Sequence, residues 1–288
     1  MAVPATHLDE VTPFGMRLRH WRHVRGISQL QLASLSGSTA RHISFLETGR
    51  SRPGRDMTLR LAEVLDLPLR ERNQLLQAAG WPPAYPQAAP DAAELRPFRS
   101  AIDRLLAAHE PFPALVLDGH ARVVAANKAA GVLFGSDLIG ANLLQRYLTD
   151  PTLRQAIVNW TDVAWAVLSR LRRQLRQAPL DERLRALVAC AEDAVADLAP
   201  PAGDHEDGLV VCPWFRAGDA VIRTITLTAR FDTAVEITLD DLRIELIYPQ
   251  DRPAEEFFRA ATPRDPDHAD ETGLIDDRSW QGAAGPIA

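Results

Sequence analysis

The chain has 288 residues, and 46% of them are apolar, which is enough for two domains with separate cores. Its formal net charge of −6, taken as an average, argues against nucleic acid as a partner. Between residues 14 and 81, however, 11 arginines stand against 5 acidic residues, so this part carries +6 and the remainder carries −12. Such asymmetry indicates one part of the chain that meets a polyanion and one that does not.

The cysteines and the apolar runs indicate the compartment. Cys190 and Cys212 form neither a disulfide framework nor a metal-ligand spacing,. The chain does not open with a charged stretch followed by an apolar run, and no apolar run approaches ~18 residues,. We therefore expect a cytoplasmic protein with reduced thiols, without membrane association.

A flexible tail over residues 1–12 is expected to precede a compact domain over residues 13–81. Phe14, Leu18 and Trp21 recur at helical spacing and lie on one side of a first helix,. Four more short helices follow before the next proline-rich stretch. Five short helices in this length predict a small all-helical domain.

The boundaries of these helices are marked by capping residues and glycines. Ser28, Thr39 and Asp56 are expected to cap the second, third and fourth helices, and Pro68 lies near the start of the fifth,. Gly37 makes the tight turn between the second and third helices,. In the second helix, the apolar residues expected to face inward are Leu30, Ala33 and either Leu32 or Leu35.

A set of five positions predicts how the second and third helices pack. Gln29, Ala33, Gly37, Ile43 and Leu46 supply a polar start, a small residue at the helix crossing, a left-handed turn and two apolar anchors. This spacing is typical of a helix-turn-helix, whose second helix enters the major groove of DNA. Without the spacing, the charges of the third helix would be read as an ordinary solvated face.

The passages "RGISQLQLA" and "ISFLETGRSRP" resemble the Xre/lambda-repressor-like family. The resemblance implies that Arg41 is the best candidate for a bidentate contact with guanine and that Arg50 and Arg52 lie near phosphates. Ser38 departs from the family, which has an apolar residue there. Glu47 is expected to pair with a nearby arginine rather than to contact DNA. The residues implied to bind double-stranded DNA are Gln29, Thr39, Ala40, Arg41, His42, Ser44, Arg50 and Arg52.

A proline-rich linker is predicted over residues 82–96, followed by a second domain over residues 97–262 and a flexible acidic tail over residues 263–288,. The second domain opens with a helix, "FRSAIDRLLAAHE", and then a hairpin around Asp118-Gly119,. Asn127 is expected to cap the next helix. Residues 142–198 read as mostly helical with a break near residue 150, and strands are expected in "GLVVCPWF", "AVIRTITLTAR" and "DLRIELIYP",.

The opening "ALVLDGHARVVAANKAAGVLFG" resembles the beginning of a PAS-type domain. The chain order, with "HEPFPALVLD", "IVNW" and "TLDDLRIELIYPQD", resembles the MmyB-like transcription regulators. The expected architecture is thus an all-α lambda-repressor-like helix-turn-helix domain followed by an α+β PAS-like ligand-binding and dimerisation domain with an antiparallel sheet. The resemblance implies a small apolar ligand, with a fatty acid as the leading class.

The residues give only a broad set of candidates for the ligand pocket, because an apolar helix stripe is more often plain core. Asn127, Asn159 or Arg170 could orient a polar end of the ligand. A ligand could reach the DNA-binding domain through the linker or through dimer contacts, and the dimer is favoured because linkers transmit orientation poorly. The residues expected at the pocket are Val116, Val124, Asn127, Phe134, Asn159, Trp160, Trp165, Leu168 and Phe215.

No catalytic motif or phosphate-binding loop occurs, so no enzymatic activity, cofactor or metal is expected,. His109-Glu110 and the acidic group at 204–207 are better read as solvated than as metal ligands. The predicted function is a homodimeric, sequence-specific DNA-binding transcriptional regulator. The alternative is a DNA-binding adaptor whose second domain binds a protein partner instead of a small molecule.

Overall fold

The structure of the chain is a computed structural model that describes residues 12–89, 91–177, 181–201 and 211–262. The chain divides into two compact units. The first unit comprises residues 1–87 together with residues 233–240, and the second comprises residues 88–232 and 241–288. The predicted tails lie outside the described residues, except for Thr12.

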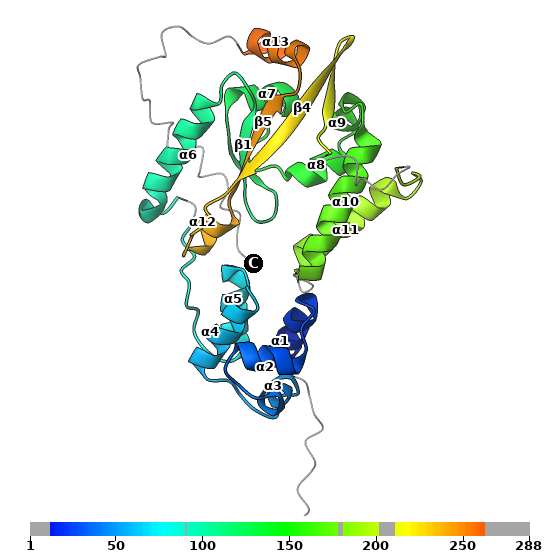
Figure 1. Cartoon of the computed structure of the whole chain (residues 1–288). Coiled ribbons are helices and arrows are strands. Elements are labelled where there is room, and N and C mark those ends of the chain that lie inside the picture. Colours follow the sequence, from blue (N-terminus) through cyan, green and yellow to red (C-terminus); the bar gives the residue numbers. More distant parts are fainter. Residues whose placement is uncertain (1–11, 90, 178–180, 202–210, 263–288) are drawn as a thin grey trace, which may run out of the picture. The chain divides into compact units, whose positions relative to one another are not determined.

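The first unit holds the five predicted helices, drawn in blue to cyan in Figure 1. Their apolar faces meet in a single cluster that includes Phe14, Leu18, Trp21, Ile43 and Leu46. The all-helical domain is therefore confirmed, with helices α1 (Pro13–Val24), α2 (Gln29–Leu35), α3 (Ala40–Glu47), α4 (Arg55–Val64) and α5 (Leu69–Ala78).

Two of the predicted caps fix the helix-turn-helix. Ser28 forms a capping box with Gln31, and the Thr39 hydroxyl accepts a bond from the His42 amide at 3.1 Å. Gly37, with φ of +64°, makes the turn between α2 and α3,. The amide of Ser38 then donates to the Ala33 carbonyl at 2.8 Å, which closes the end of α2,.

Two local predictions in this unit are wrong. Asp56 does not cap α4, because the helix begins at Arg55, two residues earlier than that cap requires, with Gly54 as its N-cap. Leu30 does not face inward but is 70% exposed; of the two alternatives for the third inward residue, Leu32 is buried and Leu35 is 63% exposed. The inner face of α2 is set by Leu32 and Ala33, and positions 30 and 35 fall to either side of that face,.

The second unit is built on a five-stranded antiparallel sheet, so the predicted α+β class is confirmed. The spatial strand order is β2-β1-β5-β4-β3, which places the last strand of the chain in the middle of the sheet. Hydrogen bonds between β1 and β5 therefore join the two ends of this unit's sequence. The strands are β1 (Ala114–Leu117), β2 (Val123–Ala126), β3 (Trp214–Ala217), β4 (Ala220–Ala229) and β5 (Arg243–Pro249).

The hairpin at Asp118-Gly119 forms, but its turn is longer than the two-residue turn that this pair favours. The Asp118 carboxylate accepts bonds from the amides of His120 and Arg122, both at 2.9 Å. The positive φ of the turn falls on Ala121, at +61°, and not on Gly119. The aspartate side chain thus stabilises a wider loop between β1 and β2.

The first of the three later strands is shifted from its predicted place. The prediction covered residues 208–215, whereas β3 begins at Trp214; residues 208–210 lie outside the described part of the chain. The backbone just before β3 is held by Asn159, which donates to the Cys212 carbonyl at 3.0 Å and accepts from the Trp214 amide at 2.8 Å. The backbone at Cys212 and at Trp214 is therefore bonded to Asn159, directly before the helix that begins at Trp160.

The described residues between 142 and 198 are mostly helical, as predicted, with a break at Asp150, which caps the helix that follows. Asn127 caps α7 as expected, through a bond from the Ala130 amide at 3.1 Å. The remaining helices of the described chain are a short 3-10 turn η1 (Ala93–Leu95), α6 (Arg96–Ala108), α7 (Lys128–Phe134), α8 (Leu143–Thr149), α9 (Pro151–Ala156), α10 (Trp160–Gln177), α11 (Glu182–Val195), α12 (Ile237–Asp241) and α13 (Arg252–Ala261).

Candidate DNA interface and ligand-binding core

Helix α3 presents one polar side while its apolar side is locked into the core. Ile43 and Leu46 are fully buried, whereas Arg41 is exposed. The Arg41 guanidinium lies over the Phe45 ring, with its central carbon 5.2 Å from the ring centroid, which restricts the directions in which the guanidinium can point. Thr39 is exposed, and the other predicted contact residues of this helix, Ala40, His42 and Ser44, are partly exposed. The predicted face is therefore accessible.

Arg22, Gln29 and Glu47 connect the first three helices through buried charges. Arg22 on α1 binds both carboxylate oxygens of Glu47 on α3, at 2.6 and 3.0 Å, and donates to the Ile27 carbonyl at 3.0 Å. Gln29, at the start of α2, donates to the same carboxylate at 2.8 Å. The expectation that Glu47 pairs with an arginine is confirmed. The amide nitrogen of Gln29 is already engaged by Glu47.

The loop after α3 carries the other two predicted contact residues. Arg50 and Arg52 are both exposed, and Pro53, which follows them, is buried. The Trp81 indole donates a hydrogen bond to the Pro53 carbonyl at 3.1 Å. Trp81, the last residue of the predicted domain, therefore holds the end of the loop that carries Arg50 and Arg52.

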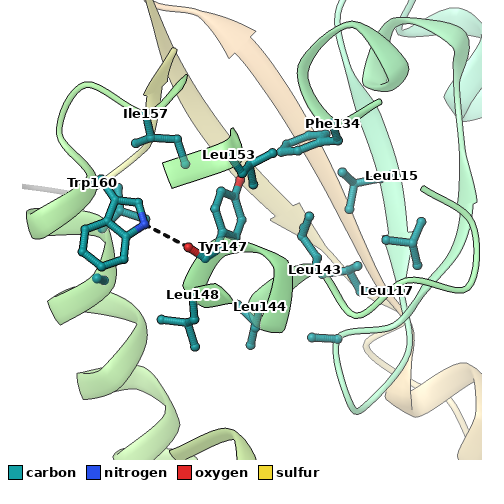
Figure 2. Packing of buried hydrophobic residues seen from close by; sticks show 14 of the residues in the cluster. Leu115, Leu117, Phe134, Leu143, Leu144, Tyr147, Leu148, Leu153, Ile157 and Trp160 are labelled. Carbon is teal, nitrogen blue, oxygen red and sulfur yellow. Dashed lines mark hydrogen bonds between the residues drawn. The ribbon is translucent and has the colours of Figure 1, made fainter. Parts of the chain in front are cut away.

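In the second unit, four predicted pocket residues meet in one buried cluster, namely Phe134, Trp160, Leu168 and Phe215. Tyr147 lies between them: its ring is 6.0 Å from that of Phe134, and Phe134 is 5.8 Å from Phe215, both edge to face. The Trp160 indole donates to the Tyr147 carbonyl at 2.9 Å, as Figure 2 shows. We call Phe134, Tyr147, Trp160 and Phe215 the aromatic core.

Trp165 packs against this cluster, and its indole N–H is an unsatisfied hydrogen-bond donor within the described part of the chain. The residue is partly buried, but its indole nitrogen is inaccessible to solvent and has no hydrogen-bond partner among the described residues. A buried indole N–H usually finds an acceptor. The position therefore suits an acceptor supplied from outside the chain.

The structure places four predicted pocket residues elsewhere. Leu115 and Leu117 of β1 belong to the buried cluster, so Val116 between them points to the opposite sheet face,. Val124 is buried but lies outside the cluster. Asn127 binds two backbone amides and two backbone carbonyls, which uses its full hydrogen-bonding capacity,. Asn159 is at the edge, where it holds the backbone before β3.

A group of charged residues lies near the aromatic core on the same side of the sheet. Arg243 and Glu245 alternate with Ile244, and the next residue in their row, Ile247, belongs to the buried cluster,. Burial raises the pKa of the Glu245 carboxyl, and the nearby Arg170 and Arg243 oppose that rise. Burial raises the pKa of the Tyr147 phenol, and the negative charge of the Glu245 carboxyl raises it further.

Arg243 experiences the opposite effect. Burial lowers the pKa of its guanidinium, and the positive charges of Arg170 and Arg230 lower it further,. Of these residues the sequence indicated Arg170, but not Arg243, Glu245 or Tyr147. Arg243 and Glu245 alternate with apolar residues, a pattern that would place the two charged side chains on the solvent face of the strand,. Tyr147 lies in a helix with several other apolar residues, and nothing in the sequence distinguishes it from them.

Two negative observations complete the site. No three His, Cys, Asp or Glu side chains gather closely enough to hold a metal ion within the described ranges, and the acidic group at 204–207 lies outside them. Across the described helices, none is both long and apolar enough to cross a bilayer.

The comparisons with known proteins divide the chain nearly as the structure does, except that residues 233–240 belong to the first structural unit but fall within the second family match. The helix-turn-helix domain family matches residues 13–75, and the MmyB-like transcription regulator ligand binding domain matches residues 98–261. A Bacillus subtilis (strain 168) protein, described as the uncharacterized HTH-type transcriptional regulator RghRB, is 35% identical over 85 residues. These residues are 29% of this chain and 59% of that protein, so the match covers less than two thirds of the relative.

The ligand-binding family match extends over more than half of the chain and contains the sheet, the aromatic core and the charged residues beside it. The helix-turn-helix match contains α3 and its polar face. The chain therefore belongs to the MmyB-like transcription regulators, in which a helix-turn-helix DNA-binding domain accompanies a ligand-binding domain.

Proposed function

We propose that this chain is a sequence-specific regulator whose second unit binds a small apolar molecule with an anionic end, and that binding changes the affinity for DNA. The favoured ligand class is a fatty acid. The observation that carries the proposal is the alternation of β5, which puts Arg243 on the same sheet face as Leu115 and Leu117 of the buried cluster that contains the aromatic core,. The aromatic core would contact the apolar body of the ligand.

The charges near the core favour an anion over a cation. The Arg243 guanidinium experiences the positive charges of Arg170 and Arg230 against the negative charges of Asp241 and Glu245, and burial pushes the Glu245 carboxyl towards its neutral form. The balance of charge is therefore positive, and an excess of one sign away from water is costly unless a partner compensates for it. A carboxylate from the ligand would supply that partner, and arginine is well suited to bind it through two parallel hydrogen bonds.

We expect long-chain saturated acids of about 14–18 carbons to raise the melting temperature of the second unit more than the alcohols of equal length. A hydrogen bond to a charged group contributes about 1.5–3 kcal/mol, which corresponds to a preference of roughly 10- to 150-fold for the acid. In Arg243→Met this preference should fall to about threefold or less. Calorimetry with matched acids and alcohols measures both values.

Arg223→Met is the matched control for that experiment. Arg223 is exposed on the neighbouring strand β4, and its alternation places it with Ile225 on the opposite sheet face,. The control should keep the wild-type preference. An equal response to acids and alcohols in the wild-type protein would contradict the anionic end, and no response to either would contradict the ligand class.

In the first unit, we propose that Arg41 reads a base edge and that the loop arginines Arg50 and Arg52 contact phosphates. The support is the exposure of all three side chains on one small, positively charged domain. Thr39, Ala40, His42 and Ser44 would lie along the same groove, and the side-chain oxygen of Gln29 would be available to the backbone or to a base.

We further propose that two copies act together. A single head makes few base contacts, and paired heads read half-sites about one helical turn apart. A protein footprint should therefore cover two half-sites, and the mass in solution at micromolar concentration should be that of a dimer. A monomer mass with a footprint over one half-site would contradict the dimer.

The adaptor alternative has its own supporting observation. Ile225 and Tyr248 form a cross-strand pair on the solvent face of β4 and β5, and Leu227 beside them is 54% exposed. Such an apolar surface suits a second protein surface. A monomer that responds to no acid but retains DNA binding would favour the adaptor over the ligand sensor.

A further inference from the structure

The segment that follows α5 is held firmly against that helix. Asn73 on α5 accepts hydrogen bonds from the amides of Ala84 and Tyr85, at 2.9 and 3.0 Å, and donates to the Tyr85 carbonyl at 2.8 Å. Asn73 is buried, so water does not readily replace these bonds,. Arg72 adds a bond to the Tyr85 hydroxyl at 3.2 Å. We call residues 81–86 the strap.

The strap begins at the DNA-facing side of the first unit. Gly80, with φ of +84°, reverses the chain at the end of α5, and the Trp81 amide then donates to the Leu76 carbonyl at 2.9 Å. The Trp81 indole donates to the carbonyl of Pro53, directly after the loop that carries Arg52. The position of that loop and the position of the strap are therefore linked by a direct bond.

The strap ends on a piece of chain that arrives from the sheet. Residues 233–240, which we call the connector, run between β4 and β5 but group with the first unit. The Ile237 amide donates to the Pro86 carbonyl at 3.0 Å, and the Ile237 side chain is 2% exposed. The Glu236 carboxylate caps the connector's helix by accepting from the Leu239 amide at 2.8 Å. The connector is thus an ordered part of the first unit.

We propose that the strap and the connector form a joint through which the second unit controls the DNA-facing loop. The connector leaves the sheet after β4 and re-enters it at Arg243, the first residue of β5. A shift of β5 would therefore move the connector, and the bonds at Ile237, Asn73 and Trp81 would carry that movement to Pro53. The joint rests on the proposed function, in which occupancy of the second unit alters DNA affinity.

The joint removes the argument against transmission through the linker. From the sequence, dimer contacts were the favoured route from the ligand to the DNA-binding domain, because linkers transmit orientation poorly. A proline-rich linker transmits orientation poorly only when it is free. Residues 84–86 are fixed by hydrogen bonds on both sides, so the premise does not hold for them. Coupling between two sites requires an element whose position both sites can bias, and the strap fulfils that requirement.

The test uses the reciprocity of coupling, because DNA must then act on the sheet as the ligand acts on DNA binding. The full chain is saturated with a duplex that it selects from a random library, and amide hydrogen exchange is followed in β4, β5 and the connector. In the wild-type protein, DNA should change exchange rates in β4 and β5 by about 5- to 150-fold, the usual range of coupling.

Two variants interrupt the joint at different points. Asn73→Ala releases the strap from α5, and Ile237→Pro removes the amide that binds Pro86 while proline remains acceptable at the first position of α12,. Both should bind the duplex within about twofold of wild type in the absence of acid, yet lose the exchange response in β4 and β5. Gln77→Ala, exposed on α5, and Ile237→Val, which keeps the amide, should retain the response.

The outcomes separate the joint from the ligand proposal. A response in β4 and β5 that persists in both Asn73→Ala and Ile237→Pro would overturn the joint, as would no response in the wild-type protein at saturating DNA. A wild-type response with no effect of any acid on the melting temperature would leave the joint standing and refute the ligand class. If acids raise the melting temperature but DNA does not change exchange in β4 and β5, the ligand class stands and the joint is refuted.

Discussion

Replacement of Arg22 by methionine is expected to lower the free energy of unfolding of the first unit by about 3–5 kcal/mol. Glu47 is only 3% exposed and accepts two charge-assisted bonds from Arg22. The substitution would leave that carboxylate buried, with only the neutral amide of Gln29 as a partner. Amide hydrogen exchange of α1 to α3 in the full chain, followed at increasing denaturant concentration, measures the change.

The double variant Arg22→Met with Glu47→Leu isolates the cause. A buried ion pair that is replaced by apolar residues of similar volume often costs little, so the double variant should regain most of the loss. Arg19→Met, exposed on the same helix, should change stability by less than about 0.5 kcal/mol,. A double variant as unstable as the single one would show that packing at Arg22, and not the buried charge, dominates.

Replacement of Arg41 by alanine is expected to weaken binding to the selected duplex by about 1–3 kcal/mol and to relax the preference at one base pair. Arg41 is exposed near the start of α3, and its contact with Phe45 restricts its orientation before DNA binds. A guanidinium in that position can form two bonds with guanine. Competition binding with singly substituted duplexes, at one fixed salt concentration, resolves the affected position.

Arg52→Ala provides the contrast with that variant. A phosphate contact carries no base information, so its loss should weaken all sequences alike and reduce the salt dependence by about one unit. The reading assignment for α3 would be wrong if Arg41→Ala behaved in the same way as Arg52→Ala. It would also be wrong if Arg41→Ala bound the selected duplex as tightly as wild type.

The first unit could be predicted closely because its signals are short-range. Ser28 and Thr39 bind amides only three residues away, and Gly37 adopts a conformation that glycine favours. The exposed Leu30 was missed because a seven-residue helix is too short for apolar spacing alone to define its inner face. That face depends on contacts with α3, which are tertiary.

The second unit was predicted in class but not in its contacts. The hairpin and the Asn127 cap again depend on neighbours in sequence. The bonds from Asn159 to the backbone at Cys212 and Trp214 span more than 50 residues, and they decide where β3 begins. The pairing of Arg243 and Glu245 with Leu117 and Leu115 also arises only when the last strand enters the middle of the sheet. Short-range sequence patterns do not predict contacts between residues that are so far apart in the chain.

Because the connector is part of the first unit, this unit is completed only some time after its helices α1 to α5 have been synthesised. Residues 12–87 leave the ribosome first, whereas residues 233–240 follow about 145 residues later. At ~5–20 residues per second, this interval lasts roughly 7–30 seconds. Under the proposed coupling, a nascent head can fold and meet DNA in that time before the piece that regulates it has been made. Newly made chains would therefore bind DNA without regard to the ligand until residues 233–240 have been synthesised.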